Sequence, residues 1–383
     1  MHPPHGILPY GHVFFSLPLF LTGVEEGDDG VKKIATSRNT RQIILLSIIG
    51  SIAAIVSFSC VNNNVFASHS KWPDLDDSLS LTSACKNISR HIMSMTQEKD
   101  TSLFIDFYNK IDSMGHASLA KKSALPSLTD SICARVYTDW SITYDANDTS
   151  FLSLLPHDIV ANKHGACLGV SLIMLMLAEQ MNCPLFGVML PGHFFCRFDD
   201  GNIRYNIEPN KNGYHHPDSY YQNRYALQSN PWYDLHSMTK QEVIGVLCYN
   251  TCTILLARHT IKEALFYGKQ AMRRLPKIPE VQGNYALCLA QNGNNDSALI
   301  VFSRLYNDCP NFNNCALNYG ALLLSQKQYD SAAIIFAKGL RYFPNDTNLQ
   351  NRLSLAQSGK PYNGTWAGLK LPFFKADKTG KKP

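Results

Sequence analysis

The stretch His164-Gly165-Ala166-Cys167-Leu168-Gly169 decides how the first half of this sequence folds. An apolar run follows it, Val170 to Met181, and its spacing predicts a buried helix. Cys167 then lies at a helix N-terminus, where unpaired backbone N–H groups carry partial positive charge. That charge favours the thiolate, which is the nucleophilic form of cysteine. Cys167 is therefore our candidate nucleophile.

Three β-rich runs follow the predicted helix. Leu185 to Leu190 and Gly192 to Phe198 are separated by Pro191, and Ile203 to Glu208 forms a third alternating run. Asp200-Gly201 lies between the second and third runs, and an Asp-Gly pair in such a place predicts a hairpin with a two-residue turn.

The predicted turn also fixes which residues face each other. A register that places Asp199 opposite Asn202 places His193 opposite Glu208. Directly opposed residues hold their Cβ atoms about 4.5–5.5 Å apart on one face of the sheet. The Glu208 carboxylate can then hold one imidazole nitrogen while the other points toward Cys167, which is the arrangement of a base oriented by an acid.

Each of these residues also has a purely structural interpretation. A lone cysteine is typical of a small core side chain, and a histidine in an apolar strand is typical of a core position. The occurrence of all three in this order indicates an active-site arrangement instead. Gly165-Ala166-Cys167-Leu168-Gly169 also fits a G-x-S-x-G nucleophile elbow with Cys replacing Ser. Elbow enzymes place the acid before the histidine, so this alternative is the weaker one.

These residues resemble the transglutaminase-like superfamily of papain-like Cys-His-Asp proteins, and more closely its bacterial branch with a short core followed by tetratricopeptide repeats. Three blocks carry the resemblance, which covers roughly residues 80–235: Asn162 to Leu172, Leu190-Pro191-Gly192-His193-Phe194-Phe195, and Asn206-Ile207-Glu208-Pro209-Asn210.

The resemblance implies an α+β, papain-like core in which Cys167 is the nucleophile and His193 is the general base. Glu208 stands where the family usually has Asp, and Asn206 and Asn210, on the same side of the strand, are alternatives for the orienting residue. The branch includes members without a complete triad. A peptide-binding scaffold without catalysis is therefore the alternative to a cysteine hydrolase or acyltransferase.

An internal repeat of 34 residues marks the C-terminal third. It joins Pro276 to Pro310 and Pro344, Ala264 to Ala298 and Ala332, and Asn250 to Asn284 and Asn318. A small residue at the helix crossing and a proline closing the second helix are typical of tetratricopeptide repeats. We expect about three units and a capping helix over residues 245–357, forming an all-α solenoid that docks a protein partner. The alternative is that the repeats only buttress the core.

The N-terminal region predicts export. Residues 42–67 carry no charge and follow Lys32, Lys33, Arg38 and Arg41, as in a secretory signal or an N-terminal membrane anchor. We assign residues 42–60 to this segment. Cys60 follows Ser59 and precedes a polar spacer, so it is a candidate lipidation site. Residues 1–41 are then a cytoplasmic extension, or a non-native one if translation starts near Val31.

The composition of the chain argues against a nucleic-acid partner and against a bound metal. A net charge of +5 over 383 residues, with much of the excess at the two ends, does not form a nucleic-acid-binding stripe. His215-His216 with Asp218 is better explained as a turn than as a metal site. We expect no cofactor and no metal. Most of the 11 cysteines are predicted to be core thiols.

These features together predict an exported, membrane-tethered protein of the cell envelope. A transglutaminase-like domain over residues 70–235 precedes the repeats, and a basic flexible tail over residues 358–383 follows them. Cys167, His193 and Glu208 would act on a protein or peptide substrate.

Overall fold

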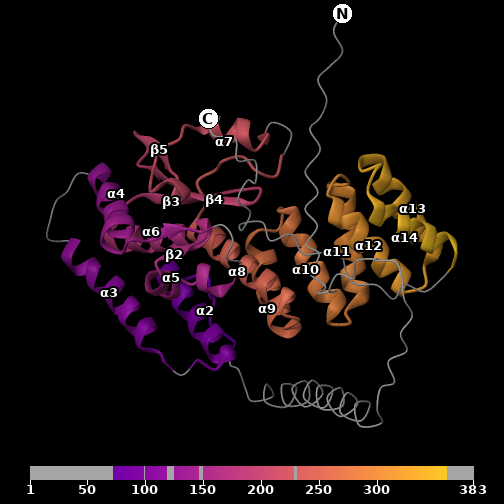
Figure 1. Cartoon of the computed structure of the whole chain (residues 1–383), viewed down its shortest axis with the longest axis horizontal. Coiled ribbons are helices and arrows are strands. Elements are labelled where there is room, and N and C mark those ends of the chain that lie inside the picture. The colour runs from indigo at the N-terminus through magenta and orange to yellow at the C-terminus, as the bar shows by residue number, and fades with distance from the viewer. Residues whose placement is uncertain (1–71, 99, 119–124, 146–149, 228–230, 360–383) are drawn as a thin grey trace, which may run out of the picture. The chain divides into compact units, whose positions relative to one another are not determined.

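The computed structural model describes residues 72–98, 100–118, 125–145, 150–227 and 231–359 (Figure 1). The chain divides into two units, residues 1–70 and residues 71–383, and every described residue belongs to the second. Within the described ranges, no helix combines the length and the apolar character needed to cross a membrane. The predicted anchor segment, Cys60 and the predicted tail beyond Gly359 lie outside the described residues.

The core domain is built around one buried helix, α6 (Cys167–Met181), which has no exposed face from Cys167 to Ala178. Four other helices pack against it: α2 (Leu81–Thr96), α3 (Ser102–Ser118), α4 (Leu125–Cys133) and α5 (Pro156–Asn162) (Figure 1). Between α4 and α6 lie the π-helical turn η1 (Ala134–Asp139), the 3₁₀ turn η2 (Phe151–Ser153) and two short parallel strands, β1 (Thr143–Tyr144) and β2 (His164–Gly165).

A three-stranded antiparallel sheet follows α6, in the order β3 (Leu185–Leu190), β4 (His193–Asp199) and β5 (Arg204–Ile207). In β4, Cys196 faces α6, because its thiol contacts the Ser171 carbonyl at 3.8 Å. The alternate residues His193, Phe195 and Arg197 lie on the other face, which is covered by α7 (Asp218–Arg224). One face of β4 therefore packs in the core, while the other presents the polar side chains His193 and Arg197.

The predicted register between β4 and β5 is wrong by two residues. Asp199 pairs with Arg204 rather than with Asn202. The turn is longer than Asp200-Gly201 because the Asp200 carboxylate accepts the backbone N–H groups of Asn202 and Ile203, at 2.9 and 2.7 Å. This side-chain turn extends the loop, as aspartate often does. A shift of two keeps every side chain on its predicted face.

The two glycines that flank Cys167 are explained by packing and not by a nucleophile elbow. A Cβ atom on Gly165 would lie 2.9 Å from Ile159 of α5. A Cβ atom on Gly169 would lie 2.4 Å from both the Ile159 side chain and the Ser153 carbonyl oxygen. Glycine at both positions lets α5 and η2 approach the start of α6 closely, which fixes the position of Cys167.

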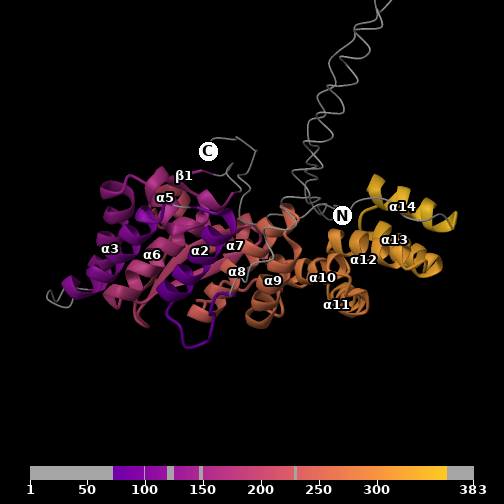
Figure 2. The same ribbon diagram turned by 90° about the horizontal axis from the view of Figure 1, so that it is seen from below.

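Seven further helices form the C-terminal part, each packed against the next (Figures 1 and 2). They are α8 (Lys240–Ala257), α9 (Ile261–Arg274), α10 (Pro279–Gln291), α11 (Asn295–Asp308), α12 (Asn313–Ser325), α13 (Tyr329–Tyr342) and α14 (Thr347–Gln357). The second helices of the pairs, α9, α11 and α13, begin 34 residues apart, and their fully buried alanines repeat at the same interval. The first helix begins at Lys240, five residues before the predicted boundary, behind a capping box of Thr239 and Glu242.

Gly169→Ala tests the close approach at the start of α6. We expect the free energy of unfolding to fall by about 1–3 kcal/mol, because the Ser153 carbonyl is backbone and cannot move aside. Gly283→Ala is the matched control, since a Cβ atom there meets its nearest neighbour at an ordinary 3.4 Å. Urea denaturation measures both. Equal stability of the Gly169 variant and the wild type would contradict the packing argument.

Candidate active site

Cys167 is the first residue of α6 and lies behind a tight backbone junction. The preceding residue, Ala166, donates its N–H to the Ser153 carbonyl at 3.0 Å and has no side-chain acceptor for the amides of the first turn. Those amides and the helix dipole lend positive potential to the region of the sulfur. The Cys167 side chain itself is buried, at 1% exposure.

His193 is the first residue of β4 and is positioned by the turn before it. Leu190 pairs with His193 across Pro191 and Gly192, and Gly192 adopts a φ of 73°. This conformation favours glycine at the second central position of a turn. His193 Nε2 lies 2.9 Å from Glu208 Oε2, and both residues are only 4% exposed. The other ring nitrogen, Nδ1, remains for the hydrogen bond that His193 shares with the Cys167 side chain.

Opposite charges control the protonation of this pair. Burial lowers the pKa of His193, but the Glu208 carboxylate and the Cys167 side chain outweigh it and raise the pKa to about 10. Burial acts to raise the pKa of Glu208, yet the His193 charge and several hydrogen bonds bring it below its ordinary value. At neutral pH the pair is therefore an imidazolium and a carboxylate.

The Glu208 carboxylate is held at both oxygens. Oε1 accepts the backbone N–H of Asn210 at 3.0 Å, and Oε2 accepts the Tyr221 hydroxyl at 3.0 Å. Glu208 lies just beyond the last β4–β5 pair, one step diagonally from the position opposite His193. The predicted contact between His193 and Glu208 is thus made through a diagonal, because the two-residue shift leaves both on one face.

The two asparagines that were alternatives to Glu208 lie elsewhere in the network. Asn206 Oδ1 accepts the Arg197 Nε–H at 2.8 Å, and its amide donates to Asp218 at 2.8 Å. Asn210 contributes its backbone N–H to Glu208. Glu208 is the residue that holds the imidazole.

A buried arginine fixes the helix that covers this face. Arg197 is 2% exposed and its guanidinium contacts Asp218 Oδ1 at 2.6 Å, together with Asn206 and the Leu235 carbonyl. Asp218 is the first residue of α7, so the arginine anchors the helix that supplies Tyr221. The guanidinium is buried while the Asp218 side chain is partly exposed, so loss of Asp218 would leave a buried cation with fewer partners. Arg197 therefore positions α7 over the His193–Glu208 pair.

Three tyrosines near the site were not singled out from the sequence. Tyr221 bonds to Glu208, the Tyr225 ring lies parallel to the His193 ring with centroids 5.8 Å apart, and Tyr144 of β1 interacts electrostatically with Cys167 and Glu208. Tyr225 interacts with Cys167 in the same way. The spacing of Tyr221 and Tyr225 by one helical turn was the only available signal, and it does not reveal which face α7 presents to the sheet.

The neighbouring imidazoles of His215 and His216 point to different partners. His215 stacks on Tyr205 with centroids 4.5 Å apart, and His216 stacks on Tyr220 with centroids 3.8 Å apart. Each ring is used as an aromatic surface beside the site.

The arrangement defines a class of site: a thiol at a helix N-terminus, facing a histidine that a carboxylate orients. Residues 87–243 match the family described as Transglut_core2, the transglutaminase-like superfamily, and this range contains Cys167, His193 and Glu208. This part of the chain is therefore similar to the transglutaminase-like superfamily.

Two solved structures are similar over part of the chain. They are MamA from residue 41 to its end, from Desulfovibrio magneticus RS-1, and the MamA RS-1 ArsTM double mutant. Each is 28% identical over 32% of this chain, with a TM-score of 0.29, and the aligned part covers 68% and 67% of those chains respectively. No curated protein matches this chain.

Glu208→Gln tests the electrostatic origin of the raised histidine pKa. With the carboxylate charge removed, burial is opposed only by the Cys167 side chain, so the pKa of His193 falls from about 10. Imidazole NMR resonances followed from about pH 5 to about pH 10 measure it. Glu242→Gln is the matched control, because Glu242 bonds His236 on the surface. A His193 pKa that stays high in the Glu208 variant would refute this explanation.

The pair also sets a pH window for stability. The raised histidine pKa adds stability that is complete below its unfolded value and disappears as pH rises through about 10. The lowered Glu208 pKa adds stability above its unfolded value that is lost on acidification.

Proposed function

We propose that Cys167, His193 and Glu208 catalyse cysteine-dependent amide or acyl chemistry on a protein or peptide substrate. The observation that carries the proposal is the buried His193–Glu208 pair, which holds Nε2 of the imidazole and leaves Nδ1 for the sulfur. A histidine fixed in this way serves an adjacent nucleophile, since orientation by a third group is what the generalised triad requires.

The proposed reaction has two stages. The Cys167 thiolate attacks an amide carbonyl, and the backbone N–H groups of the first turn of α6 stabilise the developing oxyanion. His193, already protonated, donates its proton to the leaving amine as a thioester forms on Cys167. Neutral His193 then takes a proton from the acceptor, which attacks the thioester. Water as the acceptor gives a peptidase or amidase, and an amine gives a transglutaminase.

A non-catalytic peptide-binding or scaffold protein is the second candidate. One observation favours it: Cys167 is 1% exposed, with Tyr144 and Tyr225 close by. A substrate carbonyl reaches the buried sulfur only if neighbouring side chains move. A site that never opens would bind peptides on its surface without turning them over.

We further propose that the helix pairs from α8 to α13, with α14 as a cap, are tetratricopeptide repeats that dock a protein partner. The 34-residue spacing of α9, α11 and α13 supports this assignment. The first pair also braces the core, since His91 of α2 bonds to Tyr267 of α9 at 2.8 Å. The start of the second pair is held as well, because Tyr233 before α8 donates to Glu280 of α10 at 2.7 Å. Docking therefore belongs to the later repeats.

Export and membrane attachment complete the proposal. The uncharged run after the basic cluster supports a signal or anchor over residues 42–60, and the small residue before Cys60 supports lipidation there. The catalytic domain would then act outside the cytoplasm, held at the cell envelope.

Alkylation by iodoacetamide tests the activated thiol. In the wild type we expect Cys167 to react faster than the other cysteines, because it lies at a helix N-terminus beside the protonated His193. Cys167→Ala should abolish that labelling and His193→Ala should slow it by at least about tenfold. Peptide mass spectrometry assigns each modified residue.

Tyr225→Ala tests, in the same labelling experiment, whether access of the reagent to Cys167 limits the rate. Removing the ring that lies over His193 should speed labelling of Cys167, whereas Tyr220→Ala, which removes a ring that stacks on His216 instead, should leave the rate unchanged. Slow labelling of Cys167 in both the wild type and the Tyr225 variant would favour the binding-protein alternative.

Cys60→Ala tests the lipid anchor. If Cys60 is the lipidated first residue, the mature wild-type chain carries acyl groups on Cys60 and partitions into detergent. The variant should keep its signal segment and lose the acyl mass. Intact mass measurement of the native protein decides it, and a wild-type chain that still begins before residue 42 would show an uncleaved anchor instead.

A further inference from the structure

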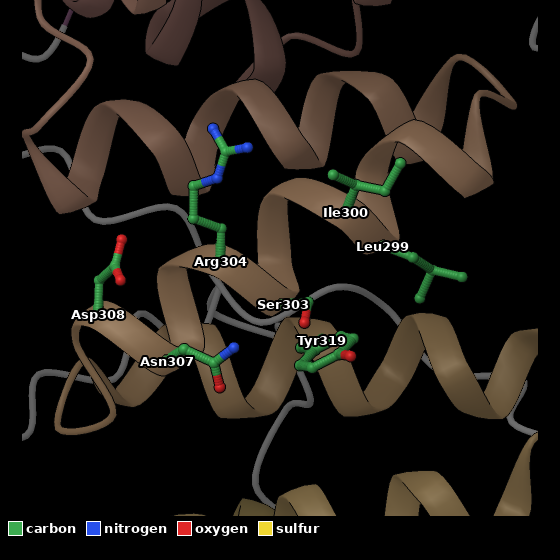
Figure 3. A pocket seen from close by; sticks show the side chains of 7 residues that line it. All are labelled: Leu299, Ile300, Ser303, Arg304, Asn307, Asp308 and Tyr319. Atoms are coloured by element: carbon green, nitrogen blue, oxygen red, sulfur yellow. The ribbon is translucent and has the colours of Figure 1, made fainter.

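A groove of about 550 Å³ lies on the outer surface of the repeats, away from the proposed active site. It runs along α11, and Tyr319 of α12 faces it from the next helix (Figure 3). Its lining residues are Leu299, Ile300, Ser303, Arg304, Asn307, Asp308 and Tyr319. Apolar side chains lie toward one end and charged side chains toward the other (Figure 3).

The 34-residue repeat assigns this groove a counterpart in the first helix pair. Moving each lining position back by one repeat gives Leu265, Phe266, Lys269, Gln270, Arg273, Arg274 and Tyr285. Leucine and tyrosine are kept at their positions, and phenylalanine takes the place of Ile300. The counterpart therefore lies along α9 as the groove lies along α11.

The counterpart site is occupied by the chain itself. Trp72 stacks on Phe266 with ring centroids 4.7 Å apart and an angle of 10°. Further along the segment, the Leu75 carbonyl accepts Arg274 Nη2 at 2.6 Å, and the Asp77 carboxylate contacts Arg273 at 2.6 Å. The segment Trp72 to Asp77 thus shows what this surface of a repeat binds. It binds a tryptophan ring, a backbone carbonyl, and a charged group whose sign is opposite to that of the residues at the edge of the site.

The later repeats leave the same outer surface exposed. Ile300 is 63% exposed, Ile334 one repeat further is 55% exposed, and Tyr342 on the same helix, α13, is 50% exposed. Large apolar side chains exposed at equivalent positions of successive repeats indicate a binding surface. α12 packs against both α11 and α13. We call the apolar residues of the groove and the exposed apolar residues of α13 the outer strip: Leu299, Ile300, Tyr319, Ile334 and Tyr342.

We propose that the outer strip binds the chain's own C-terminal tail, residues 360–375, with Trp366 in the groove on α11. Trp366-Ala367-Gly368-Leu369 repeats the Trp-x-x-Leu spacing of Trp72-Pro73-Asp74-Leu75, the segment that lies on the counterpart site. The tail thus provides a tryptophan and a leucine at the same spacing after the repeats as the segment Trp72 to Leu75 provides before them.

Charge favours the tail as the occupant. The acidic segment ending at Asp77 meets a basic rim in the first pair, where Lys269, Arg273 and Arg274 stand. In the groove, the corresponding residues are Ser303, Asn307 and Asp308, so the three cations are lost and an acidic group is gained, while Arg304 stands where the first pair has Gln270. Residues 360–375 carry three lysines and no acidic residue, which suits this rim.

Chain length also allows the contact. α14 packs directly on α13, and the described chain ends at Gly359, just after α14. The seven residues from Gly359 to Trp366 span at most roughly 25 Å when extended. α12 packs on both α14 and α11. Packed helices lie about 8–10 Å apart, so Trp366 can pass α12 and reach α11.

Photo-crosslinking of the purified full chain tests the proposal. With benzoylphenylalanine in place of Ile300, we expect intrachain crosslinks that map to residues 360–375, and Trp366→Ala should reduce their yield at least about fivefold. The same photoprobe in place of Ile203, which is 48% exposed on the β4–β5 loop, is the matched control and should not capture the tail. Mass spectrometry of the digested monomer identifies the linked peptides.

A second measurement tests binding of the tail to the outer strip separately from any effect of the tail on folding. A chain ending at Gly359 should bind a synthetic peptide of residues 360–376, and the peptide with Trp366→Ala should bind at least about tenfold more weakly, because a buried tryptophan dominates such contacts. Crosslinks confined to chain dimers would show a second copy as the occupant. That result, or an absence of tail crosslinks together with no peptide binding, overturns the proposal.

Discussion

The buried ion pair of His193 and Glu208 is the interaction on which the rest of the core depends. Two charges removed from water are costly to bury, and their mutual attraction offsets that cost only when the remaining hydrogen-bonding groups are also satisfied. Here the second carboxylate oxygen accepts the Asn210 amide, and the Tyr221 hydroxyl shares the oxygen that binds the imidazole. Tyr221 needs α7 in place, and α7 is anchored through Asp218 to Arg197. One buried pair thus explains a chain of contacts from β4 to the helix above it.

The other half of the site depends on close packing instead of charge. The N-terminus of α6 is brought against α5 and η2 because Gly165 and Gly169 leave no side chain between them. Interiors are packed to nearly crystalline density, so one added methyl group at such a contact moves backbone. The nucleophile is therefore fixed by sterics and the histidine by electrostatics, on two elements that come from different parts of the fold.

Much of this site could be predicted from local sequence. The apolar run after Cys167 indicated α6, and the alternation around His193 and Glu208 placed both on one face of the sheet, because side chains in a strand alternate with a period of two. The register could not be predicted, since it depends on the Asp200 carboxylate capping the loop and not on an Asp-Gly turn. The tyrosines could not be predicted either. Their role depends on how α7 folds back over the sheet, which the Arg197–Asp218 contact determines over 21 residues of chain.

If this arrangement makes Cys167 a working nucleophile, an acyl group can be trapped on its sulfur. With p-nitrophenyl acetate as the acyl donor, we expect a burst of p-nitrophenol and a covalent acetyl group on Cys167. Both should be absent in Cys167→Ala and much slower to appear in His193→Ala. Acetylation that is absent from Cys167, or equally fast without His193, would contradict this role of Cys167.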